Sequence, residues 1–173
     1  RYRLQNKWVI SHIGYIGGWV DTDFLVRVFQ KVKKAVPEAV LCWVGGAPDL
    51  SRLRKRYQEH DVIFAGPVPA KDVAAYFYAS DIGVLPNKKS LFQDAAFHIK
   101  LIEYGAARKC VLSSDLAEVQ RLAMPYVTLE PLEEEAWAKR LIDMRRAKWS
   151  DAWDAALERY DWSCVLAELK KVL

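Results

Sequence analysis

Short apolar runs alternate with helical patterns along most of the chain. Six runs have the length and composition of buried strands, and they span residues 8–15, 39–44, 62–65, 82–85, 110–113 and 126–129. They are nearly continuous in apolar residues, as expected for parallel strands that are covered on both faces. The alternation predicts an α/β fold, a doubly wound, mostly parallel six-stranded sheet with helices on both faces.

The segments between the strand-like runs have helical periodicity. Asp21 and Asp23 suit the start of a helix, because a carboxylate accepts from free N–H groups there. Two later apolar stripes predict a helical C-terminus: Trp137, Leu141 and Met144, then Trp162, Val165, Leu166, Leu169 and Val172. The stretch 87–95 is polar and is expected to be a loop. No repeat or linker interrupts the pattern, so we expect a single domain over residues 1–173.

Length and composition restrict the class of protein. A chain of 173 residues fits one domain or half of a two-domain enzyme, and 52% hydrophobic residues exclude a disordered chain. No apolar run reaches the roughly 18 residues of a spanning helix. Three separated cysteines, Cys42, Cys110 and Cys164, argue against a disulfide framework and favour a reducing, cytoplasmic location. The first residue is Arg1, and we expect the chain to be a fragment.

The mild net charge of +4 comes with two basic clusters, at residues 31–34 and 52–56. Their spacing is typical of solvated helix faces. No nucleic-acid motif accompanies them, so we expect no nucleic-acid partner. An anionic membrane surface would attract the same clusters, which leaves peripheral association at the cytoplasmic membrane face as an open alternative.

Glycines follow three of the predicted strands. In an open parallel sheet, ligands bind beyond the carboxyl ends of the strands, and glycine lets them approach the backbone. We therefore take Gly17, Gly18 and Gly45 as candidate ligand contacts, although each glycine alone is also explained by turn chemistry. The Gly14-x-x-Gly17-Gly18 spacing is not a dinucleotide-binding fingerprint, and the sequence contains no P-loop.

The predicted helix at residues 97–107 carries the most specific candidate site. His98 and Ile99 would offer free backbone N–H groups to an anion, and Lys100 would add a positive charge. Glu103 lies three residues after Lys100 on the same face, where its carboxylate could accept hydrogen bonds from ribose hydroxyls. An ordinary surface ion pair explains the spacing of these two residues equally well.

At these residues the chain resembles the C-terminal domain of GT-B glycosyltransferases, in particular the retaining family 4. The resemblance rests on an ordered series of segments: Ile13-Gly14-Tyr15-Ile16-Gly17, Val44-Gly45-Gly46-Ala47-Pro48, Val62 to Val68, Ala79 to Pro86, Lys100-Leu101-Ile102-Glu103-Tyr104 and Tyr160-Asp161-Trp162-Ser163. It implies a Rossmann-like half of a GT-B fold that binds a nucleotide-diphosphate sugar in polysaccharide or glycoconjugate biosynthesis. The chain would belong to a hexosyltransferase-like, retaining enzyme.

The resemblance also assigns roles to residues. Glu103 matches the second Glu of the family's Glu-x7-Glu motif, which holds the ribose. Phe97, His98 and Ile99 match the segment whose amides meet the donor phosphate and sugar, and Val68 matches a position beside the nucleobase.

Two departures from the family pattern concern charge. The first Glu of the motif is replaced by Ala95, next to Asp94. The basic pair expected after the first strand is missing, since only Arg27 lies there, and Lys100 is its replacement.

Catalytic residues are not fixed by the sequence. Asp94 and His98 are candidates, His98 as a general acid or base. We interpret His12, inside a strand, as a satisfied core or edge residue. No His/Cys/Asp cluster has metal spacing, so we expect no metal and no cofactor besides the sugar-nucleotide substrate.

Three functional hypotheses follow. In the first, the chain binds the donor, and a missing N-terminal domain supplies the acceptor, a glycan or lipid-linked glycan, so the isolated chain is inactive. In the second, the chain is a non-catalytic nucleotide-binding or scaffold module of the same fold, as Ala95 would suggest. A receiver-type domain is disfavoured, because no strand ends in the required Asp.

Overall fold

The computed structural model describes residues 4–171, apart from the side chains of Glu168 and Leu169. Its centre is a six-stranded sheet in the order β3-β2-β1-β4-β5-β6, with every neighbouring pair parallel. The strands are β1 (Trp8–Ile13), β2 (Ala39–Val44), β3 (Val62–Gly66), β4 (Ile82–Leu85), β5 (Cys110–Ser113) and β6 (Val127–Leu129). The predicted doubly wound sheet is confirmed.

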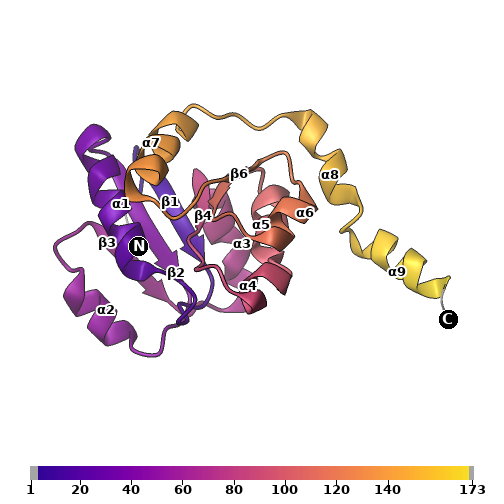
Figure 1. Cartoon of the computed structure of the whole chain (residues 1–173), viewed down its shortest axis with the longest axis horizontal. Coiled ribbons are helices and arrows are strands. Elements are labelled where there is room, and N and C mark those ends of the chain that lie inside the picture. Colours follow the sequence, from indigo (N-terminus) through magenta and orange to yellow (C-terminus); the bar gives the residue numbers. More distant parts are fainter. Residues whose placement is uncertain (1–3, 172–173) are drawn as a thin grey trace.

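Helices cover both faces of this sheet (Figure 1). They are α1 (Thr22–Ala35), α2 (Leu50–Arg56), α3 (Ala70–Ala79), α4 (Leu91–Ala95), α5 (Ile99–Ala106), α6 (Ala117–Leu122), α7 (Glu134–Met144), α8 (Ala155–Glu158) and α9 (Trp162–Lys170), with a 3-10 turn η1 (Asp151–Trp153). One core cluster joins the sheet to α1 and α7, and the other joins it to α3, α5 and α6. The inner strands β1, β2, β4 and β5 are therefore largely buried on both sides, which explains their nearly continuous apolar sequences, whereas the edge strands β3 and β6 are partly exposed.

Local sequence explains where α1 begins. The side chain of Asp21 accepts a hydrogen bond from the N–H of Phe24, 3.0 Å away, as the sequence predicted. Behind this cap, α1 buries an apolar stripe that packs on α7, where the rings of Phe24 and Trp137 meet edge to face. The entry of α1 at the carboxyl edge of β1 is thus fixed by one cap and one core contact.

The C-terminal helices leave the body of the molecule. Figure 1 shows α8 and α9 as an arm that projects beyond α6. The base of the arm is held by a ring cluster of Tyr126, Trp149 and Trp153. Trp162 on α9 is 76% exposed. The helical C-terminus is confirmed, although Val172 and the side chain of Leu169 in the predicted stripe lie outside the described residues.

The structure differs from the sequence prediction in the segment between β4 and α5. The predicted loop at residues 87–95 contains the helix α4, whose start is capped by Ser90. The helix predicted from Phe97 begins at Ile99. All three cysteines are free, and no helix within residues 4–171 is long and apolar enough to cross a membrane.

Candidate functional site

The strand order reverses between β1 and β4, and the loops that follow these two strands meet there. Asp21 N–H donates to the carbonyl of Pro86 at 3.0 Å, and Lys88 N–H donates to the carbonyl of Trp19 at 2.7 Å. Val20 and Asn87 form an isolated antiparallel bridge between the same loops. In open α/β sheets this switch point is the usual place for a ligand.

The loops after β1, β2 and β3 are bonded to one another through their backbones. Ile16 N–H donates to Gly46 at 2.8 Å, and Gly45 N–H donates to Gly66 at 3.0 Å. Gly45 has a φ of +136°, and a Cβ built there would lie 2.0 Å from the carbonyl oxygen of Gly14. Only glycine fits this position, so the three loops form one continuous platform.

Gly17 and Gly18 lie on this platform beside the switch point. Within residues 4–171, the backbone N–H groups of these two glycines have no hydrogen-bond partner. A Cβ built on Gly18 would meet nothing within 4 Å, whereas the same atom on Gly17 would collide with the ring of Trp19. The loop therefore offers free N–H donors and open space to a ligand.

The helix α5 is fixed to the sheet by Tyr104, a residue whose role the sequence did not reveal. Its hydroxyl donates to the carbonyl of Ser11 on β1 at 2.8 Å, and its ring packs edge to face on Phe77. A Cβ built on Gly83 would lie 2.7 Å from the Tyr104 ring, so glycine at that position makes room for it. The ring is fully buried, and burial raises the pKa of its phenol. Tyr104 thereby sets the distance between α5 and the switch point.

The first turn of α5 presents the predicted Lys100–Glu103 pair. Lys100 Nζ lies 2.7 Å from Glu103 Oε2, and the two side chains are 34% and 35% exposed. The Lys100 ammonium covers Oε2, which is buried in the unbound chain. Within residues 4–171, the backbone N–H groups of His98 and Lys100 have no partner, whereas that of Ile99, predicted to be free, donates to the carbonyl of Phe97 at 3.1 Å. Anion donors, a cation and a carboxylate acceptor therefore lie within one turn of helix.

The two catalytic candidates are engaged in local structure. Asp94 Oδ1 accepts from the N–H of Ala117 at 2.9 Å and so tethers α4 to α6. His98 is 9% exposed, and its Nε2 lies 3.0 Å from the carbonyl oxygen of Gln93. Gln93 in turn accepts from Asn87 Nδ2 at 2.8 Å. This chain of contacts orders the segment between β4 and α5, and sequence reasoning missed the part that Gln93 plays in it.

The remaining predicted contacts lie apart from one another. Val68 is half-buried in the loop after β3 and packs on the core beneath it. Phe97 is 49% exposed, and its ring centre lies 5.9 Å from that of Tyr160 at the foot of the arm. The structure thus places Val68 and Phe97 on different elements around the same sheet edge.

His12 differs from the interpretation as a satisfied core residue. One ring nitrogen, Nδ1, lies 3.1 Å from the carbonyl oxygen of Val84 on β4, but the other, Nε2, is buried without a partner. Burial lowers the pKa of His12 to about 4. The residue was expected to be fully hydrogen-bonded, and half of its capacity is unused.

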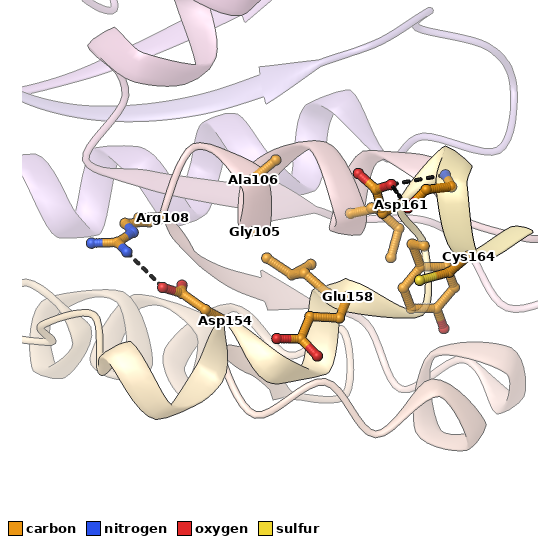
Figure 2. Close-up of a pocket in the computed structure, with 11 residues that line it drawn as sticks. Gly105, Ala106, Arg108, Asp154, Glu158, Asp161 and Cys164 are labelled. Atoms are coloured by element: carbon orange, nitrogen blue, oxygen red, sulfur yellow. Dashed lines mark hydrogen bonds and ion pairs between the residues drawn. The ribbon is translucent and has the colours of Figure 1, made fainter.

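Two cavities border α5. One, of about 600 Å³, lies between α5 and the arm and is lined by Asp154, Glu158 and Asp161 (Figure 2). Its basic residue, Arg108, is paired with Asp154 at 2.5 Å. This acidic lining is unsuited to a diphosphate. The other cavity, of about 280 Å³, lies between α3 and α5, and Glu103 contributes to its wall.

Metal ligands do not gather at this edge. Within residues 4–171, no group of three or more His, Cys, Asp or Glu side chains is arranged to hold an ion. That donor binding needs no protein-bound metal stays a prediction.

The six-stranded parallel sheet with this strand order defines the class: one Rossmann-like half of a GT-B glycosyltransferase fold. Residues 9–146 match the family described as Glycosyl transferases group 1, and the chain belongs to that family. The resemblance to the C-terminal domain of GT-B glycosyltransferases is thereby confirmed.

Individual relatives are consistent with this assignment. TuaH of Bacillus subtilis, whose name describes a teichuronic acid biosynthesis glycosyltransferase, is 27% identical over 92% of this chain and 42% of its own length. The crystal structure of Anabaena Alr3699/HepE with UDP and glucose superposes with a TM-score of 0.77 at 17% identity, covering 98% of this chain and 49% of that one.

This chain is also similar to a C-terminal domain whose structure was solved on its own. The C-terminal domain of LpcC, a glycosyl transferase group 1 family protein from Francisella tularensis, superposes with a TM-score of 0.64 at 17% identity over 94% of this chain and 86% of that one. The chain spans about half the length of the curated relatives that it matches.

Proposed function

We propose that the chain is the donor-binding half of a glycosyltransferase and holds a nucleotide-diphosphate sugar at the carboxyl edge of the sheet. The observation that carries this proposal is the first turn of α5, where free N–H groups, Lys100 and Glu103 lie together beside the switch point. The complex of HepE with UDP and glucose supports a donor of this class.

The diphosphate would lie against the amides of His98 and Lys100, with the Lys100 ammonium adding the positive charge. A glycosyl transfer leaves negative charge on the nucleoside diphosphate, and fixed donors at that point stabilise it. Gly17 and Gly18 would face the same group from the other side of the switch point. With the Lys100 ammonium drawn to the diphosphate, the Glu103 carboxylate would accept from the ribose, and Val68 would border the base.

The acceptor would be bound by an N-terminal half that lies outside this chain. The likeness to the C-terminal domain of LpcC and the half-length match to the relatives support this arrangement. The acceptor would be a glycan or lipid-linked glycan, and the sugar would be transferred with retention of configuration. On this proposal the isolated chain binds the donor without turnover.

The enzyme would act in the cytoplasm, with peripheral membrane association as the alternative from the sequence. The basic clusters give that alternative less support than their sequence suggested. Lys31 pairs with Glu135 at 2.6 Å, and Arg56 pairs with Asp23 at 2.7 Å. Charges neutralised within the protein attract an anionic surface or nucleic acid less strongly.

Calorimetry with UDP, GDP and ADP, each free and as a nucleotide sugar, tests the proposal. We expect one nucleotide series to bind, and Glu103→Gln to weaken it about tenfold or more, because hydrogen bonds to a charged group contribute roughly 1.5–3 kcal/mol. Asp143→Asn on α7 is the matched control, since it breaks another surface lysine pair, with Lys139 at 3.0 Å. Absence of binding to every nucleotide would contradict the proposal.

A second candidate is a non-catalytic module of the same fold. It is favoured by Ala95, which stands on α4 where the family motif has a carboxylate. Glu103→Ala separates the two candidates. A large loss of donor binding supports the donor domain, and unchanged binding supports the module.

A further inference from the structure

The imidazole of His12 lies at the floor of the switch point. Backbone pairing between β1 and β4 runs from Ile10 and Ile82 to Ser11 and Gly83 and goes no further. The next residue of β1 is His12, and its Nδ1 reaches across to the carbonyl oxygen of Val84 at 3.1 Å. The ring therefore continues the link between the two strands at the point where the backbone ladder stops.

The bond to Val84 determines the tautomer. A carbonyl oxygen only accepts hydrogen bonds, so Nδ1 must carry the proton and donate it. His12 is buried, and burial together with the nearby Lys100 ammonium lowers the pKa of the imidazole to about 4, against the opposing effect of the Val84 bond. The ring is thus neutral near pH 7, and Nε2 presents a lone pair.

This lone pair has no partner in the protein. His12 is 6% exposed, and Nε2 is among the few buried polar atoms without a hydrogen bond within the described residues. A Cβ built on Gly14 would lie 3.6 Å from Nε2 and would have no other neighbour within 4 Å. Glycine at position 14 therefore leaves open the space next to this nitrogen, on the side of the ligand-facing loop.

The chemistry of a neutral acceptor restricts what can occupy that space. A phosphate oxygen brings no proton and would face the lone pair unfavourably, whereas a hydroxyl donates to it. A buried water shared with the unpartnered Trp43 Nε1–H is the competing occupant, because the Trp43 ring meets His12 edge-on with 5.2 Å between centroids.

We propose that His12 Nε2 accepts a hydrogen bond from a hydroxyl of the nucleotide sugar bound at the switch point, which makes His12 a residue that selects for that hydroxyl. The inference rests on the proposed donor-binding function. Ribose and the transferred sugar both carry hydroxyls, and the experiment below separates them. A site built to pair a hydroxyl disfavours the analogue that lacks it, because its own polar group is then left unpaired.

Two substitutions separate the ring nitrogens. His12→Asn places an amide N–H near the position of Nδ1, so it keeps a donor for Val84 and removes the acceptor at Nε2. His12→Gln places an amide near the position of Nε2 and removes the donor to Val84. We expect the Asn variant to melt close to the wild type and bind donor three- to tenfold more weakly, the range for one neutral hydrogen bond. The Gln variant should melt lower and keep more of the affinity.

Calorimetry with UDP and UDP-glucose gives the decisive comparison, with GDP and GDP-mannose in their place if the wild type prefers guanine. Weaker binding of the nucleotide sugar alone in the Asn variant assigns the hydroxyl to the transferred sugar. An equal loss for the free nucleotide assigns it to ribose. Unchanged affinity for both overturns the inference and leaves the donor domain intact. A wild type that binds neither nucleotide series contradicts the proposed function itself, and the inference falls with it.

Nitrogen NMR of the imidazole provides a readout that a purely structural role would not move. The chain contains three histidines, so the His12 signals are assignable by difference from the Asn variant. We expect free protein to show a protonated Nδ1 and an unprotonated Nε2, and the Nε2 resonance to shift toward hydrogen-bonded values when donor is added. An Nε2 resonance that stays in place at saturating donor supports the water and overturns the proposal.

Discussion

The two sides of the switch point are held in place by different kinds of interaction. On one side, the glycine loops at residues 14–20, 45–48 and 66–69 are joined by backbone hydrogen bonds. On the other side, the β4–α5 segment at residues 86–106 is ordered by side chains, through Gln93, Asp94 and His98, and it holds the charged pair Lys100 and Glu103. Both sides offer free N–H groups, but the first adds shape and the second adds charge.

The kind of interaction on each side determines which substitutions that side tolerates. A position defined by backbone conformation fails when any Cβ is added, whereas a position defined by a side chain fails when one functional group is removed. We therefore expect the glycine loops to be sensitive to size and the β4–α5 segment to be sensitive to chemistry.

The largest effect is expected for Gly45→Ala. The backbone at φ +136° is strained for alanine, and the new Cβ would fall 2.0 Å from the carbonyl oxygen of Gly14. We expect the free energy of unfolding in urea to fall by at least about 2 kcal/mol. Gly18→Ala is the control, because its Cβ meets nothing within 4 Å and should leave stability unchanged. Equal stability of the two variants would show that the loops do not form a rigid platform.

The buried imidazole of His12, which lies between the two sides, is expected to make the free energy of unfolding depend on pH. Its pKa is lowered to about 4 in the folded chain, against 6.5 for the ordinary group, so the unfolded chain binds more protons in this window. The contribution of neutral His12 to the free energy of unfolding is complete above pH 6.5. It falls as the pH drops from 6.5 toward 4, by as much as about 3 kcal/mol. Urea unfolding of wild type and His12→Asn across this pH range measures the difference in the free energy of unfolding. If this difference did not change with pH, the lowered pKa of His12 would be contradicted.

A smaller effect is expected for Tyr104→Phe, which removes the hydrogen bonds between α5 and Ser11 on β1. The carbonyl of Ser11 loses the donor at 2.8 Å, while the ring still fills the space over Gly83. We expect a loss of about 1 kcal/mol in the free energy of unfolding, with little change in nucleotide affinity. Tyr78→Phe, at a side chain that is 66% exposed, should cost nothing. A large fall in affinity would mean that α5 shifts without this bond.

The smallest effect is expected at Asp94. Its Oδ1 accepts from Ala117 N–H, and an amide oxygen can do the same, so Asp94→Asn should retain stability and nucleotide affinity. Asp94→Ala removes the acceptor and should cost about 1 kcal/mol, as the loss of a helix cap does. If the Asn variant alone lost binding or transfer in the two-domain enzyme, Asp94 would act on the substrate after all.

The sequence predicted the fold well because the strands are covered on both faces and carry an unbroken apolar signal. It also placed the glycine loops and the Lys100–Glu103 pair at one edge, since parallel strands end on the same side. It failed where the structure depends on long-range partners. Nothing near His12 in the chain indicates that Val84, 72 residues later, would bond only one of its nitrogens.

The helix α4 shows a different limit of the sequence. Its apolar residues do not form a buried stripe, because Leu91 and Phe92 are 93% and 72% exposed. The segment is ordered instead by the Ser90 cap and by polar contacts such as those of Asp94 and Gln93. Periodicity reports burial, so a short helix held by polar contacts gave no signal.

Tyr104 and the Lys100–Glu103 pair share one helix, so α5 fixes the distance and the angle between the core and the proposed binding site. Each residue of an α-helix turns the chain by about 100° and advances it by about 1.5 Å. Inserting or deleting a single residue between Lys100 and Tyr104 would swing the ammonium a quarter-turn or more away while the buried ring stayed in its slot over Gly83. The spacing within Lys100-Leu101-Ile102-Glu103-Tyr104 is therefore a length and an angle, and the number of residues between Lys100 and Tyr104 cannot change without moving the ammonium.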